Sequence, residues 1–316
     1  MPISNSSSGT PKPSLNLVQL SDVTPKPVNW LWPGVIPKGK LSMLVGHPGL
    51  GKSTLTAAIA AIVSTGRPWP VCDVNADVGE VMFISSEDDL KDTVKPRSIA
   101  AGAEDSRIRF IRSVSVGQNR NRPFAIKKDI EKLSQYDIDL LIVDPITSNL
   151  AGVEMNNTGE VREVLELLRD YAEEKNVAVL GVSHLNKSEK SENISRVSGS
   201  MAFIAVPRVV HLLADDPDCP GRRFLFPLKG NLGPNQDCFA FSIEPRMLEG
   251  GIETSAIVWE DECVPAPSDW GVPTKPKSKL EKAKDFLITL LSKKSYQATE
   301  VYHLGEKSGH ALATLK

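Results

Sequence analysis

Short apolar runs alternate with amphipathic stretches along most of the chain. Strands are expected at 41–46, 80–86, 140–144 and 177–184, and helices at 52–64, 89–102, 126–135 and 159–175. The four strand candidates are apolar throughout, which is typical of parallel strands covered by helices on both faces. Three more apolar runs, 208–214, 223–229 and 238–244, follow without helices between them and predict an antiparallel extension at one edge. The predicted fold class is therefore α/β, with a mostly parallel sheet.

Changes in composition divide the chain into four segments. Residues 1–27 are rich in Ser, Pro and Asn and predict a flexible arm before an α/β domain at 28–264. Pro and Lys dominate 265–279, which is typical of a linker. Leucines at helical spacing then indicate a small helical segment at 280–316. That segment fits a truncated winged-helix module that binds DNA, or a solvated appendage.

Composition and charge narrow the class of protein. Hydrophobic residues make up 41% of the chain and charged residues 24%, as in ordinary globular proteins. No apolar run approaches the roughly 20 residues that span a bilayer, and the first residues lack the apolar core of a signal peptide. We therefore expect a cytoplasmic protein without a membrane partner. From Lys275 onward nine lysines face four acidic residues, a weak indication of nucleic acid.

A glycine-rich motif lies between the first expected strand and helix. It reads Gly46, His47, Pro48, Gly49, Leu50, Gly51, Lys52 and Ser53, followed by Thr54. This is the G-x-x-x-x-G-K-[ST] pattern, whose backbone amides surround phosphate oxygens at a helix N-terminus. Lys52 is expected to reach the β- and γ-phosphates, and Ser53 to bind Mg²⁺. The motif predicts ATP and Mg²⁺ as ligands.

Acidic residues follow two of the expected strands. Asp144 ends the buried run LLIVD, as expected of the carboxylate that holds Mg²⁺. Pro145 comes next and can do no acid–base chemistry, so the hydrolytic base is expected elsewhere. Glu87, at the end of the run EVMFISS, is the candidate because neighbouring parallel strands end at the same edge. The alternative is that Glu87, Asp88 and Asp89 cap the next helix; both readings can hold for different members of the trio.

A further polar residue ends the strand at 177–184. His184 is a candidate sensor of the γ-phosphate, with a purely structural histidine as the alternative. The loop at 185–200 is long and polar, and such loops inside compact domains are usually functional. Its Asn186, Lys187, Lys190 and Arg196 are expected to contact single-stranded DNA.

The ordered blocks resemble a known family. They are GHPGLGKS, FISSED, LLIVDP, GVSHLNK, SRVSGSMAF, PRVVHL and LKGNLGP. Over residues of about 28 to 245, this order resembles the RecA-like P-loop ATPase core of hexameric replicative helicases, most nearly the RepA type of plasmids and phages and less nearly the DnaB type.

The resemblance implies specific roles. Glu87 would be the base, His184 the sensor, Arg208 an arginine finger entering the neighbouring subunit's site, and Lys229 a second such cation. The alternatives are that Arg208 pairs with a local carboxylate such as Asp215, and that Lys229 is an exposed lysine at a strand end. Arg97 would lie near the base and the subunit interface. The chain departs from the DnaB type where Asn231 replaces an arginine and where the sensor is His rather than Gln.

Three classes of function compete. The first is a DNA-dependent ring ATPase of helicase type, self-associated as a hexamer, on single-stranded DNA, with a primase or initiator as partner. The second is a RecA-like ATPase in recombination, loading or regulation of a mobile element, without unwinding. The third is a P-loop kinase or switch, which we disfavour because no convincing basic lid lies between 52 and 140.

Overall fold

The computed structural model describes residues 15, 17–72, 74–85, 87–117, 120–185, 201–233, 238–264, 286–287, 290–291 and 296–308. The expected linker at 265–279, the loop at 186–200 and most of the expected helix after Leu280 lie outside these residues. In the C-terminal segment a helix, α7, runs from Ala298 to Lys307. Within the described part of the chain, no helix is long and apolar enough to cross a membrane.

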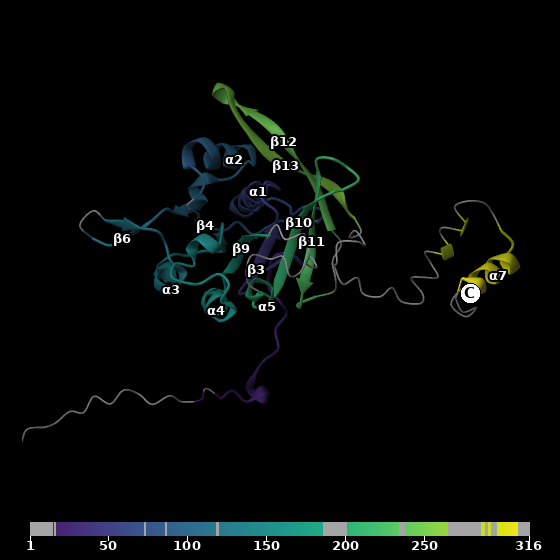
Figure 1. The fold of residues 1–316 in the computed structure, drawn as a ribbon, viewed down its shortest axis with the longest axis horizontal. Coiled ribbons are helices and arrows are strands. Elements are labelled where there is room, and N and C mark those ends of the chain that lie inside the picture. Colours follow the sequence, from purple (N-terminus) through teal and green to yellow (C-terminus); the bar gives the residue numbers. More distant parts are fainter. Residues whose placement is uncertain are drawn as a thin grey trace, which may run out of the picture.

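A nine-stranded sheet forms the centre of the molecule, in the order β13-β12-β11-β10-β3-β9-β8-β4-β5 (Figure 1). Its strands are β3 (Leu41–Gly46), β4 (Val81–Ile84), β5 (Ile108–Ile111), β8 (Leu140–Val143), β9 (Ala178–His184), β10 (Val209–Asp215), β11 (Arg222–Gly230), β12 (Cys238–Leu248) and β13 (Ile252–Val264). The strands from β10 to β5 pair in parallel, and β11, β12 and β13 extend the sheet antiparallel. This mostly parallel α/β sheet with an antiparallel edge is the predicted RecA-like fold class.

One strand differs from the prediction in its direction. The run at 208–214 was expected in the antiparallel extension, but β10 pairs in parallel with β3, with Leu213 opposite Gly46. The reason is the long connection from β9, which includes the short helix α5 (Ala202–Ala205). A crossover of a dozen or more residues allows parallel pairing, whereas a tight hairpin does not. The extension therefore begins one strand later and gains β13.

Helices cover both faces of the sheet and create two cores. On one face α1 (Lys52–Thr65) packs against the strands, and on the other face α3 (Ile126–Asp129), α4 (Thr158–Lys175) and α5 do so. Asn157 caps α4 by accepting bonds from the N–H groups of Gly159 and Glu160. This arrangement buries the side chains on both faces of the parallel strands, as their continuous apolar sequences require.

The β12–β13 hairpin packs beside the helix that follows the glycine-rich loop. Strand β13 contacts α1 and α2 (Lys95–Ala100), and α2 contacts α1 in turn, so α1 is covered by more than the parallel strands. Eleven of its 14 residues are buried as a result. The antiparallel edge thus reaches the region where the loop and α1 meet.

Shorter elements complete the fold. They are β1 (Trp30–Trp32), β2 (Ile36–Pro37), β6 (Val114–Ser115), β7 (Asn121–Arg122), the π-helical turn η2 (Leu90–Val94), and the 3₁₀ turns η1 (Leu20–Asp22), η3 (Asp105–Arg107), η4 (Ile130–Gln135), η5 (Thr147–Asn149) and η7 (Glu249–Gly251). The helix expected at 89–102 is η2 followed by α2, and the one expected at 126–135 is α3 followed by η4.

Candidate nucleotide-binding site

The glycine-rich loop connects β3 to α1, as the motif requires. Gly49 and Gly51 have φ angles of 83° and 86°, which side-chain-bearing residues rarely adopt. A Cβ atom on Gly51 would also lie 2.1 Å from Cδ1 of Ile243, on the overlying hairpin. The loop is therefore held in a tight turn between the sheet and β12, and α1 begins directly after it at Lys52, so the N–H groups of the first turn of α1 belong to the phosphate-binding turn.

Lys52 lies inside this turn. Its ammonium group donates to the carbonyl oxygens of Gly46, at 2.9 Å, and His47, at 2.8 Å. Burial lowers the pKa of Lys52 to about 8, while Asp144 and Glu87 act in the opposite direction. The group remains mostly protonated at neutral pH and supplies a buried positive charge where phosphates would lie.

The two expected Mg²⁺ ligands meet. Asp144 follows the buried strand β8, and its carboxylate accepts a hydrogen bond from the hydroxyl of Ser53 in the first turn of α1. Burial raises the pKa of Asp144 to about 6 despite this bond. A hydroxyl and a carboxylate are oxygen donors of the kind Mg²⁺ takes together with phosphate oxygens and water. The donor set therefore fits a nucleotide-bound Mg²⁺.

The acidic trio after β4 divides into three positions. Glu87 lines the cavity beside the loop, and Oγ of Ser148 lies 3.4 Å from its Oε1. Asp88 pairs with Arg97 at 2.6 Å. Asp89 caps η2 by accepting a 2.7 Å hydrogen bond from the N–H of Lys91. Helix capping thus belongs to Asp89, while Glu87 faces the cavity.

His184 ends β9 directly beside the loop. It pairs with Gly46 in the parallel register, and the N–H of Leu185 donates to the Gly46 carbonyl. Its Nδ1 is buried and, within the described residues, has no hydrogen-bond partner. Burial and then the charge of Lys52 lower the pKa of His184, so the ring is neutral at physiological pH.

Together these residues line one open cavity of about 360 Å³ at the carboxyl edge of the parallel strands. From the predicted set it includes Gly49, Gly51, Lys52, Ser53, Thr54, Glu87, Asp144 and His184, and also Asp88 and Arg97. The carboxyl edge is where open α/β sheets bind ligands. Residues at the carboxyl ends of four strands that are far apart in the sequence, β3, β4, β8 and β9, therefore share one site.

Three lining residues were not anticipated from the sequence. Arg223, Ile243 and Ser255 come from β11, β12 and β13, which were interpreted only as an edge extension. Leu213 on β10 lies opposite Gly46, and Asp215 follows two residues later. Arg223 pairs with Asp215 and therefore lies just beyond the level of Gly46, at the cavity. Its Nε is buried and has no hydrogen-bond partner among the described residues, although Asp215 lies 3.7 Å away. Only the cross-strand register reveals this placement.

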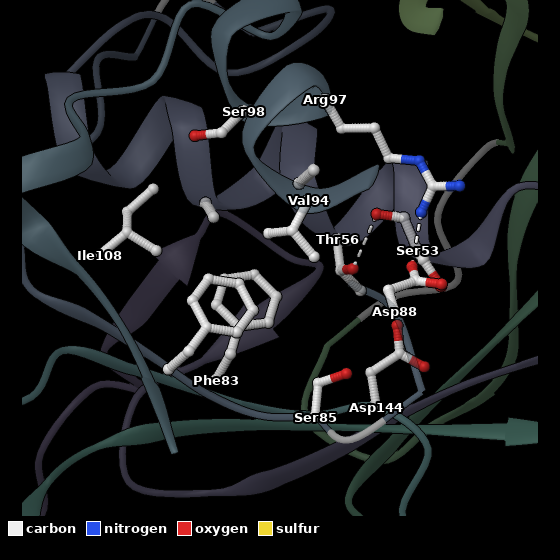
Figure 2. A pocket seen from close by; sticks show the side chains of 13 residues that line it. Ser53, Thr56, Phe83, Ser85, Asp88, Val94, Arg97, Ser98, Ile108 and Asp144 are labelled. Carbon is white, nitrogen blue, oxygen red and sulfur yellow. Dashed lines mark hydrogen bonds and ion pairs between the residues drawn. The ribbon is translucent and has the colours of Figure 1, made fainter. Parts of the chain in front are cut away.

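A second, smaller cavity of about 40 Å³ adjoins the first beneath α2 (Figure 2). Figure 2 shows Arg97 extending toward Asp88, with Ser53 and Asp144 nearby. The apolar end is formed by Phe83, whose ring stacks on that of Phe110 at 4.5 Å. Arg97, expected near the base, therefore stands at the boundary of both cavities.

Two predicted residues lie at the amino ends of the parallel strands, opposite the cavity. Arg208 is exposed and precedes β10, and its backbone N–H donates to the carbonyl of Leu41 at the start of β3. Strand β3 spans roughly 17 Å at about 3.3 Å per residue, and this length separates the backbone of Arg208 from the glycine-rich loop. Lys229 lies beside β10 and donates to the carbonyls of Ile204, Ala205 and Pro207 at 2.8–2.9 Å. Neither residue is brought to the cavity of its own chain.

Comparison with known proteins agrees with this geometry. A family model described as an AAA domain matches residues 10–190, more than half of the chain. The match includes the glycine-rich loop, Glu87, Asp144 and His184, and ends before β10.

Curated relatives point to the same kind of domain. The DNA repair protein RadA of Helicobacter pylori is 24% identical over 235 residues, which is 72% of this chain and 45% of the relative. RadA of Streptococcus pneumoniae is 27% identical over 158 residues, 49% of this chain and 32% of the relative. The chain matches less than half the length of these relatives. With a family match over more than half of its residues and a P-loop at the carboxyl edge of its sheet, the chain belongs to the AAA domain family and carries a P-loop ATPase domain.

Proposed function

We propose that the chain hydrolyses ATP with Mg²⁺ in response to single-stranded DNA, in a recombination, repair or loading role. The observation that carries the chemistry is the single cavity lined by Lys52, Glu87, Asp144 and His184. The similarity to relatives named DNA repair proteins supports DNA as the stimulus.

The five polar residues predicted for catalysis and Mg²⁺ binding that line the cavity each have a role in this proposal. Lys52 neutralises the β- and γ-phosphates, and Ser53 and Asp144 hold Mg²⁺. When bound, Mg²⁺ supplies positive charge to the phosphate oxygens. Glu87 accepts a proton from the attacking water, with the Ser148 hydroxyl beside it to orient the carboxylate. His184, neutral and next to Gly46, senses the γ-phosphate.

The antiparallel extension provides the opposite wall. Ile243 covers Gly51 and presents an apolar surface to a nucleotide base, and Ser255 lies on the neighbouring strand. Arg223 adds a cation at this wall. We propose that the base and ribose lie against these three residues.

The proposal includes self-association. Phosphoryl transfer is accelerated by a cation that enters as charge spreads over the γ-phosphate. Arg208 is exposed and lies at the far edge from its own cavity, so it fits delivery to a neighbouring chain in a ring. Lys229 would have to release three carbonyl oxygens to act in the same way. We therefore propose Arg208 as the principal cation in trans and a hexamer as the assembly.

A replicative helicase is the second candidate function. The seven ordered sequence blocks, from GHPGLGKS to LKGNLGP, favour it. Both candidates hydrolyse ATP and bind DNA, and only the helicase separates strands. A primase or initiator partner belongs to this second candidate alone.

ATP hydrolysis measured with and without a single-stranded oligonucleotide, at low and moderate salt, tests the proposal. The expected result is stimulation by DNA that weakens as salt rises. A parallel assay with a forked duplex distinguishes the candidates, because strand separation would favour the helicase. A mass measurement with and without ATP and DNA tests the ring. Hydrolysis that DNA leaves unchanged at every salt concentration would contradict DNA dependence.

A further inference from the structure

The β6–β7 hairpin carries an unusual concentration of positive charge. Residues 106–128, which include it, contain five arginines and two lysines and no aspartate or glutamate. Figure 1 shows β6 extending away from the central sheet. We propose that Arg112 and Arg120 of this hairpin bind the phosphate backbone of single-stranded DNA. The inference rests on the DNA dependence of the proposed function and names a surface for it.

Most cations of this stretch already have partners. Arg107 and Arg109 both pair with Glu80, at 3.0 and 2.7 Å. Arg122 pairs with Asp129 through two hydrogen bonds of 2.5 and 2.7 Å. Within the described residues, Arg112 and Arg120 make no ion pair, although the charge of Arg112, after the N–H of Lys91, helps to lower the pKa of Asp89. Two exposed guanidinium groups are thus available on one hairpin, and guanidinium groups bind phosphates in a bidentate manner.

The base of the hairpin is held firmly. The carboxylate of Asp129 is fully buried, and the hydrogen bonds from Arg122 keep its pKa well below the usual range. Val114 packs against the core, in register with Arg122. At the far end, the N–H of Val116 donates to the Arg120 carbonyl at 2.9 Å. The two exposed arginines therefore lie on a hairpin whose ends are fixed, which lowers the entropic cost of binding.

The position of the hairpin suits a DNA-responsive ATPase. Strand β5 is parallel to β4, with Ile111 opposite Ile84. The chain therefore leaves β5 at the same edge of the sheet at which it leaves β4 toward Glu87. DNA bound by Arg112 would lie next to the segment that carries the candidate base.

Single-stranded DNA fits this surface better than a folded partner does. Val116 is 54% exposed and lies between Ser115 and Gly117, so the hairpin offers no broad apolar patch. Two cations with one exposed apolar side chain match phosphates with an unstacked base. Contacts to phosphates carry no sequence information, so binding should depend on salt rather than on base sequence.

The test is binding of a labelled oligo-dT, followed by fluorescence anisotropy over a range of salt concentrations. The double variant Arg112→Ala, Arg120→Ala should bind on the order of tenfold more weakly at low salt. The slope of log affinity against log salt should be shallower by about 1.4, because each single-strand phosphate contact contributes about 0.7. Arg112→Lys, Arg120→Lys should retain the parent slope. The matched control is Arg162→Ala, Arg169→Ala on α4, which removes the same charge and should leave binding intact.

Thermal melting and DNA-independent ATP hydrolysis should be unchanged in the double variant. A photo-crosslinking residue at Val116 in the otherwise unaltered chain gives a second measurement, in which DNA should be captured. Parent-like affinity and slope in the double variant, without capture at Val116, would overturn the hairpin assignment and leave DNA dependence standing. An equal loss in the α4 control would overturn it as a general charge effect. A parent chain that binds no DNA would overturn both proposals.

Discussion

The hydroxyl of Ser53 donates a hydrogen bond to the carboxylate of Asp144, joining the first turn of α1 to the end of β8. The pair connects two sequence motifs that lie about 90 residues apart in the printed sequence. It also places a hydroxyl and a carboxylate close to Lys52, where both could bind the same Mg²⁺ ion as the phosphates of a nucleotide.

Asp144→Asn should strongly impair Mg²⁺-dependent hydrolysis. The amide keeps the shape of the side chain but removes the negative charge that favours the metal. We expect hydrolysis to fall on the order of 100-fold, with a higher Mg²⁺ concentration needed for half-maximal rate. Steady-state rates across a Mg²⁺ titration measure both. Asp139→Asn, at the amino end of the same strand, is the charge-matched control and should keep the parent Mg²⁺ dependence.

Arg208→Ala should abolish most hydrolysis without weakening ATP binding. A cation delivered in trans contributes about 10³-fold or more to the rate, and it does not hold the ground-state nucleotide. Mixing Arg208→Ala with the inactive Lys52→Ala variant should restore activity, because one interface then combines an intact loop with an intact arginine. No recovery at any mixing ratio would argue against a shared site.

His184→Gln should retain hydrolysis, whereas His184→Ala should lose its stimulation by DNA. Glutamine offers a neutral hydrogen-bonding group like the neutral imidazole, and alanine offers none. The ratio of rates with and without DNA is the quantity to measure. Equal stimulation in both variants would assign His184 a purely structural role.

Buried His211 should make the fold sensitive to acid. Its Nε2 lies 2.9 Å from the carbonyl of Val35, and burial lowers its pKa from 6.5 to about 4. Below pH 6.5 the unfolded chain takes up a proton that the folded chain does not. This contribution to stability is complete above pH 6.5 and falls by about 3 kcal/mol toward pH 4. Denaturant unfolding over this pH range gives the free energy of unfolding of the parent and of His211→Gln. The difference between the two isolates the contribution of His211 from that of Asp144, whose raised pKa changes stability with pH in the opposite direction. Curves of unfolding free energy against pH that run parallel in the two proteins would contradict the role of His211.

Structural features that depend on one contiguous stretch of sequence could be predicted from that stretch. The loop from Gly46 to Ser53 lies between a strand and a helix as expected, and Asp144 and Glu87 follow buried strands. Each depends on local pattern and on the rule that parallel strands end at a common edge.

Features set by pairing between distant strands were not predictable. Arg223 reaches the cavity only because β11 reverses beside β10, and β10 itself is parallel only because its connection is long. The sequence left open which member of the trio caps the next helix, because that depends on the exact residue at which η2 begins, Leu90. Boundaries on this scale are beyond pattern reading.

The most direct test of the account is a comparison of Glu87→Gln with Asp89→Asn in parallel ATP-binding and ATP-hydrolysis assays. Both changes remove one negative charge from the same short segment, but only Glu87 lines the nucleotide cavity. A general base contributes roughly 10²–10⁴-fold to the rate. Glu87→Gln should bind ATP like the parent and lose hydrolysis by that factor, while Asp89→Asn should keep hydrolysing. Hydrolysis by Glu87→Gln at the parent rate would contradict the assignment of Glu87 as the general base.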